Sequence, residues 1–238
     1  LGTTEFFRRE FLTDARALIP RPETEELVEM VLNRIPAHPV RVLDMGTGSG
    51  IIGITLALEL KDRAREVVLA DISPKALDLA LENAMRLGAR VSTIQTDLFE
   101  NLPATRSDEE RQSAEEPEQN TEEAPEQPRT AQETRFDVIV ANLPYIADGE
   151  ELAPEVMRDP HTALFGGPQG WEIIERFLSQ ARDYLTENGF VALEIGHDQA
   201  KDILELAEQS EKYEDLKIVK DLAGNDRVFV GKLKKVLA

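Results

Sequence analysis

Apolar runs of strand length alternate with segments of helical period from Val40 onward. The predicted strands lie at residues 41–45, 67–71, 91–97, 136–142 and 190–196. The predicted helices lie at residues 51–60, 74–87, about 169–185 and 199–208. The helix at 74–87 is expected to have Ser73 as its N-cap and an apolar face formed by Leu77, Ala80, Leu81, Ala84 and Leu87. Because parallel strands are joined by crossover connections, this alternation predicts a parallel sheet with helices on both faces.

The chain closes with two further apolar stretches, DLKIVKDL and RVFVGKL, separated only by a turn at Gly224 and Asn225. So short a connection favours an antiparallel pair of strands. A mostly parallel sheet with such an ending is typical of class I methyltransferases rather than of dinucleotide dehydrogenases. We therefore predict an α/β, Rossmann-like fold with a seven-stranded, mostly parallel sheet and an antiparallel C-terminal strand.

The segment before Val40 has a different pattern. The stretch EFFRREFLTD alternates roughly as a short strand or β-hairpin does, which places a hairpin within residues 1–20. The next stretch, LIPRPETEELVEMVLNRI, predicts a helix that opens at Pro22. The main domain is then expected at residues 21–238. The apolar face of its first helix consists of Leu27, Val28, Val31, Leu32 and Ile35.

Residues 105–134 have the composition of an insertion without a core. They contain ten acidic and three basic residues, three prolines, and no Ile, Leu, Val, Met or aromatic residue. Such a segment cannot bury enough apolar surface to offset the entropy of ordering, so we expect a disordered acidic insertion. The formal net charge of the whole chain is −19, which would repel a phosphate backbone and weighs against nucleic acid as a direct partner.

The chain contains no cysteine, which excludes disulfide bonds, thiolate metal sites and a cysteine nucleophile. No run approaches the roughly 18 apolar residues of a membrane span, so no membrane partner is expected. The three histidines lack the spacing of metal ligands, and we expect no metal. The default location is the cytoplasm, with an organelle matrix not excluded.

The sequence DMGTGSG at residues 44–50 lies where the first predicted strand turns into a helix. Glycines permit close approach of a ligand there, and the helix offers free N–H groups at its N-terminus. The glycine spacing fits both S-adenosylmethionine and NAD. An acidic residue two positions before the first glycine favours a ligand with a cationic amino-acid tail. The candidate donor-binding residues of this segment are Asp44, Gly46, Thr47, Gly48, Ser49 and Gly50.

Two more acidic residues end predicted strands. Asp71 closes the second strand, where a carboxylate can accept hydrogen bonds from ribose hydroxyls. Asp97 closes the third strand and is followed by Leu98 and Phe99, which could flank an adenine ring or belong to the core. We count Asp71, Asp97 and Leu98 among the cofactor-binding candidates.

The fourth predicted strand runs into Asn142, Leu143, Pro144 and Tyr145. The carboxyl ends of central strands face the ligand crevice of such a sheet, so Asn142 is expected opposite the glycine loop. An amide nitrogen is a poor nucleophile. Accepting its N–H bonds on the Asn142 side chain and the Leu143 carbonyl would orient it and stabilise developing positive charge. These four residues are the catalytic and substrate-binding candidates, with Asn142 also touching the donor.

Several motifs in order resemble the glutamine N5-methyltransferases that modify peptide-chain release factors, the PrmC/HemK family. The motifs are LIPRPETEELVE, VLDMGTGSGIIGI, the strand-end Asp71, VANLPYI, GGPQGWEIIERFL and LEIGHDQ. The resemblance implies transfer of a methyl group from S-adenosylmethionine to the glutamine of a Gly-Gly-Gln loop. It also implies a further N-terminal helical domain. Since the chain begins at Leu1, we expect it to be part of a longer product whose residues 1–20 belong to the linker.

Leu143 departs from the family's usual Asn-Pro-Pro-Tyr, and Asn-Leu-Pro-Tyr also occurs in rRNA adenine dimethylases. The alternatives are therefore a nucleic-acid adenine amino-methyltransferase, a ribosomal-protein glutamine methyltransferase, or an inactive paralogue that only binds the donor. Arg21 and Glu23 either shape the substrate mouth or cap a helix, and Glu194 either lines the crevice or supports it. A monomer that binds release factors is the expected assembly.

Overall fold

The computed structural model describes residues 2–103, 135–153, 156 and 159–235. The predicted acidic insertion at 105–134 lies outside the described residues. Within them no helix is long and apolar enough to cross a membrane.

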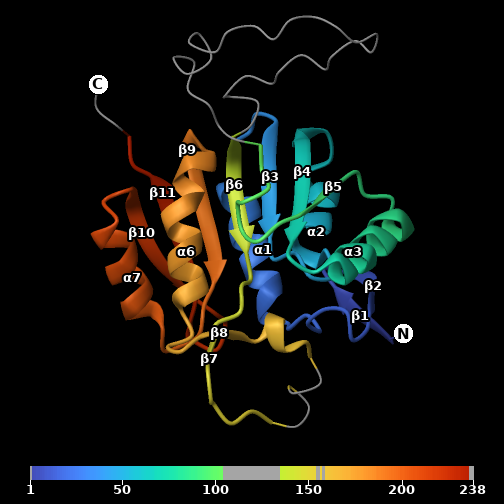
Figure 1. The fold of residues 1–238 in the computed structure, drawn as a ribbon. Helices are drawn as coiled ribbons and strands as arrows, with labels where there is room; N and C mark the ends of the chain where they lie inside the picture. Colours follow the sequence, from blue (N-terminus) through green and yellow to red (C-terminus); the bar gives the residue numbers. More distant parts are fainter. Residues whose placement is uncertain (1, 104–134, 154–155, 157–158, 236–238) are drawn as a thin grey trace, which may run out of the picture.

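A seven-stranded sheet forms the centre of the molecule (Figure 1). In sheet order its strands are β10 (Tyr213–Lys220), β11 (Asp226–Leu233), β9 (Leu185–Glu194), β6 (Phe136–Ala141), β3 (Val40–Met45), β4 (Ala64–Asp71) and β5 (Ser92–Gln95). Only β11 runs against its neighbours, while every other pairing in this sheet is parallel. The predicted fold class, including the antiparallel strand near the C-terminus, is confirmed.

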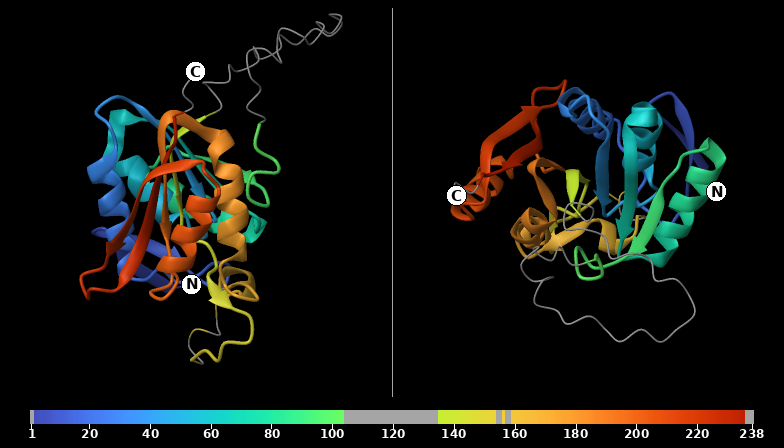
Figure 2. Two further views of the ribbon diagram at one scale, coloured as in Figure 1. Left: turned by 90° about the vertical axis from the view of Figure 1, so that its left-hand side faces the viewer. Right: turned by 90° about the horizontal axis from the view of Figure 1, so that it is seen from above.

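Helices cover both faces of the sheet (Figures 1 and 2). They are α1 (Glu23–Arg34), α2 (Ile51–Leu60), α3 (Pro74–Leu87), α6 (Glu172–Ala181) and α7 (Ala200–Gln209), with 3-10 turns at Lys61–Arg63, His161–Ala163 and Arg182–Tyr184. Alternate residues of each central strand enter two separate cores, so Val42 packs with α1 and α2 whereas Leu43 packs with α6 and α7. This arrangement leaves the strand ends as the places where side chains can meet a ligand.

The predicted N-terminal hairpin is present as β1 (Gly2–Phe6) and β2 (Arg9–Thr13), paired antiparallel. It packs against α3, where the Asn83 side chain accepts from Leu12 N at 2.7 Å and donates to Leu12 O at 3.1 Å. This contact corrects the predicted apolar face of α3. Leu79 is fully buried because the hairpin side covers it, whereas Leu81, expected inside, is 39% exposed.

The sequence patterns missed a two-stranded parallel sheet, β7 (Ile146–Ala147) with β8 (Phe165–Gly167). Both strands are too short to show a period, and their pairing depends on the fold around them. Because β7 begins directly after Tyr145, its pairing with β8 holds the chain at the end of the segment at 142–145.

Candidate functional site

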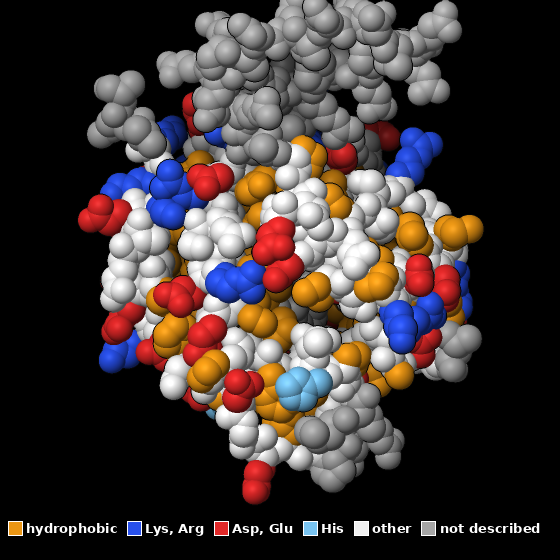
Figure 3. All heavy atoms as spheres, viewed as in Figure 1, with side chains coloured by type: hydrophobic (Ala, Val, Ile, Leu, Met, Phe, Trp, Pro, Cys, Tyr) orange, Lys and Arg blue, Asp and Glu red, His pale blue; other side chains and the backbone are white. Residues whose placement is uncertain are grey.

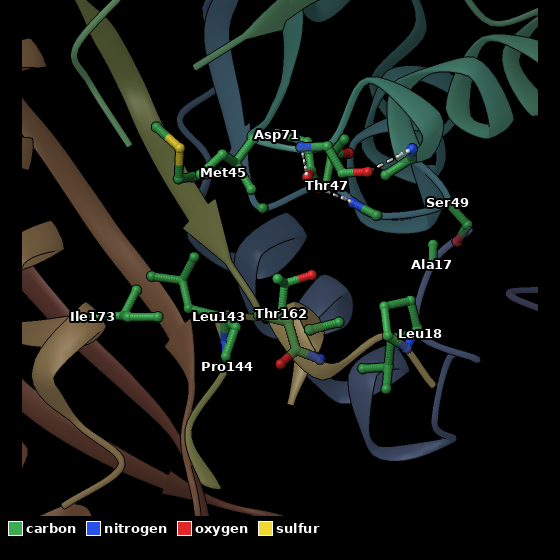
Figure 4. Close-up of a pocket in the computed structure, with 18 of the residues that line it drawn as sticks. Ala17, Leu18, Met45, Thr47, Ser49, Asp71, Leu143, Pro144, Thr162 and Ile173 are labelled. Carbon is green, nitrogen blue, oxygen red and sulfur yellow. Dashed lines mark hydrogen bonds between the residues drawn. The ribbon is translucent and has the colours of Figure 1, made fainter. Parts of the chain in front are cut away.

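A cavity of about 380 Å³ opens at the carboxyl ends of β3, β4 and β6. This is the edge at which ligands bind in open α/β sheets. The predicted residues on its wall are Gly46, Thr47, Gly48, Ser49, Asp71, Asp97, Leu98, Asn142, Leu143 and Pro144. Thr47, Ser49 and Asp71 lie around the same hollow as Leu143 and Pro144 (Figure 4). Asp44, Gly50, Tyr145 and Arg21, also predicted, do not belong to the wall.

The loop between β3 and α2 needs its glycines for both conformation and space. Gly46 has φ +68°, and a Cβ built on it would lie 2.9 Å from Leu143 Cδ2. Gly50 has φ +81°, and its Cβ would lie 2.6 Å from Ile54 Cδ1. Such left-handed backbone strains any residue with a side chain. Gly46 therefore lets this loop lie directly against the segment that follows β6, and Gly50 lets it lie against α2 and α3.

Asp44 anchors the glycine loop from behind. Its carboxylate is fully buried, and Oδ2 accepts from Thr47 Oγ1 at 2.6 Å and from Gly53 N at 2.8 Å. Oδ1 has no hydrogen-bond partner among the described residues. Burial raises the pKa of Asp44 to about 6, although the bonds from Thr47 and Gly53 lower it. The structure thus places Asp44 behind the loop rather than on the cavity wall.

Asp44 should make stability depend on pH. Its folded pKa of about 6 lies above the ordinary value of 3.8, so its contribution is complete below pH 3.8 and is lost as the pH rises toward 6. Between those values the free energy of unfolding of the wild type, minus that of Asp44→Asn, is expected to fall by about 1.4 kcal/mol per pH unit. Urea titrations from pH 4 to 7.5 measure this difference, which should decline up to about pH 6 and level off above it, and a difference that is flat from pH 4 to 6 would contradict the assignment.

Asp71 connects β4 to the glycine loop. Oδ2 accepts from Gly48 N at 2.9 Å, and Oδ1 accepts from Ser73 N at 2.8 Å. Burial raises the pKa of Asp71, and the hydrogen bonds from Ser73 and Gly48 oppose that shift. Ser73 also caps α3, as predicted, by accepting from Ala76 N. The Asp71 carboxylate is held in place and still faces the cavity.

Leu98 and Phe99 are both buried in the same core, and Leu98 also reaches the cavity. Leu98 lines the cavity and has the unusual φ of +49° for a side-chain-bearing residue. Phe99 lies in the core, stacked on Tyr184 with ring centroids 4.9 Å apart. Asp97 receives a hydrogen bond of 3.2 Å from Arg176 of α6, a partner that the sequence did not indicate. Core packing therefore holds for both residues, and Leu98 in addition lines the cavity.

The segment after β6 brings an amide to the cavity. Asn142 is half-buried, lines the wall, and makes no side-chain hydrogen bond within the described part of the chain. Leu143 is 5% exposed and packs against Gly46, so its side chain has a packing role in addition to any role of its carbonyl. Burial raises the pKa of the Tyr145 phenol, and the nearby Glu194 carboxylate raises it further.

Sequence reasoning missed two parts of the wall. The link from β2 to α1 contributes Ala17, Leu18 and Pro20, the first turn of α1 contributes Thr24, and the segment from Pro160 to Phe165 forms another side. The LIPRPETE motif was a signal for the first part, in which Leu18, Pro20 and Thr24 reach the wall and the predicted Arg21 and Glu23 do not. The second part has no pattern of its own. Among the described residues no group of three or more His, Cys, Asp or Glu is placed to hold a metal ion.

Comparisons with known proteins agree with this site. A family model described as "Methyltransferase domain" matches residues 38–227. The release factor glutamine methyltransferase of Koribacter versatilis is 39% identical over 97% of this chain and 72% of that protein. The protein of the same name from Neisseria gonorrhoeae is 38% identical over 100% of this chain and 76% of its own.

Among solved structures, a methyltransferase from Pyrococcus furiosus shares the fold with a TM-score of 0.61 and 18% identity, covering 97% of this chain and 91% of that one. The fold, the cavity at the strand ends and the sequence similarity over nearly the whole of this chain agree. The chain belongs to the release factor glutamine methyltransferase family, whose members are S-adenosylmethionine-dependent enzymes.

Proposed function

We propose that this enzyme methylates the side-chain amide nitrogen of the glutamine in the Gly-Gly-Gln loop of peptide-chain release factors. The observation that carries the proposal is the contact between the glycine loop and the Asn142 segment within one cavity. Relatives with nearly full coverage of the chain bear the corresponding name. The working location is then the compartment where release factors act, the cytoplasm or an organelle matrix, and a monomer remains the predicted assembly.

The residues on the wall fit the methyl donor. S-adenosylmethionine, when bound, supplies a methyl group made electrophilic by its sulfonium. Glycine at positions 46 and 48 keeps the loop free of side chains, and Thr47 and Ser49 add hydroxyl groups beside it. The fixed Asp71 carboxylate would accept from ribose hydroxyls, and Leu98 offers an apolar surface. Asp97 stays a cofactor-binding candidate although it also pairs with Arg176.

Asn142 and Leu143 would hold the acceptor. The Asn142 side-chain oxygen and the Leu143 carbonyl each accept one N–H of a glutamine amide, which directs the nitrogen lone pair toward the donor. Both oxygens carry partial negative charge, so they stabilise the positive charge that develops on that nitrogen. No strong base is needed, because the methylated nitrogen is acidic and sheds its proton to water.

Two observations bear on the alternatives to a release-factor methyltransferase. The chain is strongly acidic, and on the face shown in Figure 3 the described Lys and Arg side chains lie among Asp and Glu rather than forming a basic face. This is unfavourable for a nucleic-acid substrate. An inactive paralogue would require that Leu143 disturb the acceptor site, yet its side chain is accommodated against Gly46. Methylation of a glutamine in a ribosomal protein would need the same chemistry, so the choice between these two substrates is made by experiment.

Labelled S-adenosylmethionine offered in parallel to purified release factor, ribosomal protein and ribosomal RNA tests this proposal. We expect label in the release factor alone. Label only in RNA or only in ribosomal protein would overturn the substrate, and donor binding without any transfer would support the inactive alternative.

Leu143→Pro tests whether this position acts through its carbonyl. The substitution keeps that oxygen, and Pro144 still favours an extended backbone before it. We expect kcat to stay within about tenfold of the wild type, or about 1.4 kcal/mol of barrier. The melting temperature should drop, because a buried side chain against Gly46 is lost. A gain of much more than tenfold would mean that the second proline contributes directly.

A further inference from the structure

Gln199, in the turn between β9 and α7, contacts the acceptor segment from outside the cavity. Its side chain is 8% exposed and does not line the wall. Nε2 donates to the carbonyl oxygen of Tyr145 at 2.7 Å, and Oε1 accepts from Gly196 N at 2.9 Å. Both ends of this amide are thus engaged, which fixes its orientation and joins the turn to the backbone of the Asn142 segment.

The acceptor segment is tightly enclosed on the side where Gln199 lies. A Cβ on Gly166 would lie 2.5 Å from the Pro144 carbonyl oxygen. A Cβ on Gly170 would lie 2.5 Å from the Tyr145 carbonyl oxygen and 3.1 Å from Gln199 Nε2. Because backbone atoms lie directly against backbone atoms here, the segment has little room to shift in that direction. The hydrogen bond from Gln199 therefore acts on a segment that is already closely packed.

The carboxyl end of β9, which leads into the Gln199 turn, also contacts a second wall of the cavity. Glu194, at the end of β9, accepts from Thr24 Oγ1 at 2.8 Å. Glu194 is 1% exposed and Thr24 is 2% exposed, and Thr24 lines the cavity. Residues 194–199 therefore contact the LIPRPETE turn through Glu194 and the Asn142 segment through Gln199.

We infer that Gln199 is a positioning residue for methyl transfer, which holds the Tyr145 backbone and thereby places the Asn142 amide and the Leu143 carbonyl. It touches neither donor nor acceptor. Only Leu143 and Pro144 lie between Asn142 and Tyr145, and Pro144 has a fixed φ, so a displacement at Tyr145 is passed along a stiff segment. Misplacement of reacting groups by about 1 Å costs on the order of 10²-fold in rate. This inference rests on the proposed function.

Two variants separate the Tyr145 bond from general packing. Gln199→Met keeps the volume but removes both hydrogen bonds, whereas Gln199→Glu keeps the acceptor for Gly196 N and replaces the donor to Tyr145 by a carboxylate oxygen, which repels the Tyr145 carbonyl. The matched control is Gln209→Met, at the exposed end of the same helix α7. We expect kcat to fall about 10²-fold in both Gln199 variants, with KM for S-adenosylmethionine within about twofold and no change in the control.

A merely structural role would lower the melting temperature and donor binding together with kcat. A Gln199→Glu variant with wild-type kcat, or one whose kcat loss is matched by an equal loss of donor affinity, would overturn the inference.

Amide hydrogen exchange gives a readout that needs no substrate. Ile146 N donates to Leu164 O at 3.0 Å and Asp148 N donates to Gly167 O at 2.9 Å, just beyond the segment. We expect both amides to exchange faster in the Gln199 variants and at the wild-type rate in Gln209→Met. Unchanged exchange at both amides would also overturn the inference. If the wild type methylates no release factor, the proposed function fails, and the exchange rates still decide whether Gln199 holds this segment.

Discussion

Asn142→Ala is expected to abolish methyl transfer while only weakening donor binding. The side-chain oxygen of Asn142 is the side-chain acceptor that this segment brings to the cavity wall, and its amide has no partner within the described residues. Its loss leaves the glutamine held by the Leu143 carbonyl alone and removes stabilisation of the charge on nitrogen. A decrease in kcat of at least about 10³-fold, or roughly 4 kcal/mol, is the expected size.

Single-turnover transfer and calorimetric titration of the donor measure the two effects separately. Asn33→Ala, at an exposed position of α1, is the matched control and should behave as the wild type. Retained transfer in Asn142→Ala would refute the role assigned to this residue. Complete loss of donor binding would instead move Asn142 from the acceptor site to the donor site.

Asp71→Ala is expected to have the largest effect on the donor. The substitution removes the carboxylate that would accept from ribose, and it releases Gly48 N and Ser73 N from their 2.9 Å and 2.8 Å bonds. Charged hydrogen bonds of this kind contribute about 1.5–3 kcal/mol each. We therefore expect the Kd for S-adenosylmethionine to rise by about 10²-fold or more, with kcat at saturating donor changed far less.

Asp71→Asn refines this prediction, because its amide oxygen keeps one acceptor and the variant should fall between alanine and wild type. Asp78→Ala, on the exposed face of α3, serves as the control with unchanged Kd. Equal affinity in all four proteins would show that the Asp71 carboxylate acts on the loop alone and does not contact the donor.

The sequence was sufficient for the parts of the fold that local patterns encode. The strand from Val40 to Met45 is an apolar run that ends at Gly46, the helix from Ile51 to Leu60 is an apolar run that begins after Gly50, and both match the structure closely. The cap at Ser73 and the closing antiparallel pair follow from short-range turn chemistry in the same way. The acidic insertion lies outside the described residues, so its predicted disorder stays a prediction.

The remaining parts depend on contacts between distant segments. Leu81 was expected inside because the period alone cannot show that the hairpin covers the other side of α3. Asp44 was expected at the ligand, but its nearest donors, Thr47 and Gly53, turn it into a buried anchor for the loop. Likewise, the bond from Gln199 to Tyr145 joins residues 54 positions apart, which no motif spacing reveals.

The most direct test of the account is to locate the transferred methyl group. Release factor treated with this enzyme and S-adenosylmethionine should carry one added methyl group on the glutamine of its Gly-Gly-Gln peptide by fragmentation mass spectrometry. A release factor with alanine in place of that glutamine should remain unmodified. A methyl group found on another residue, or on the alanine variant as readily as on the wild type, would contradict the proposal that this cavity grips a glutamine side-chain amide.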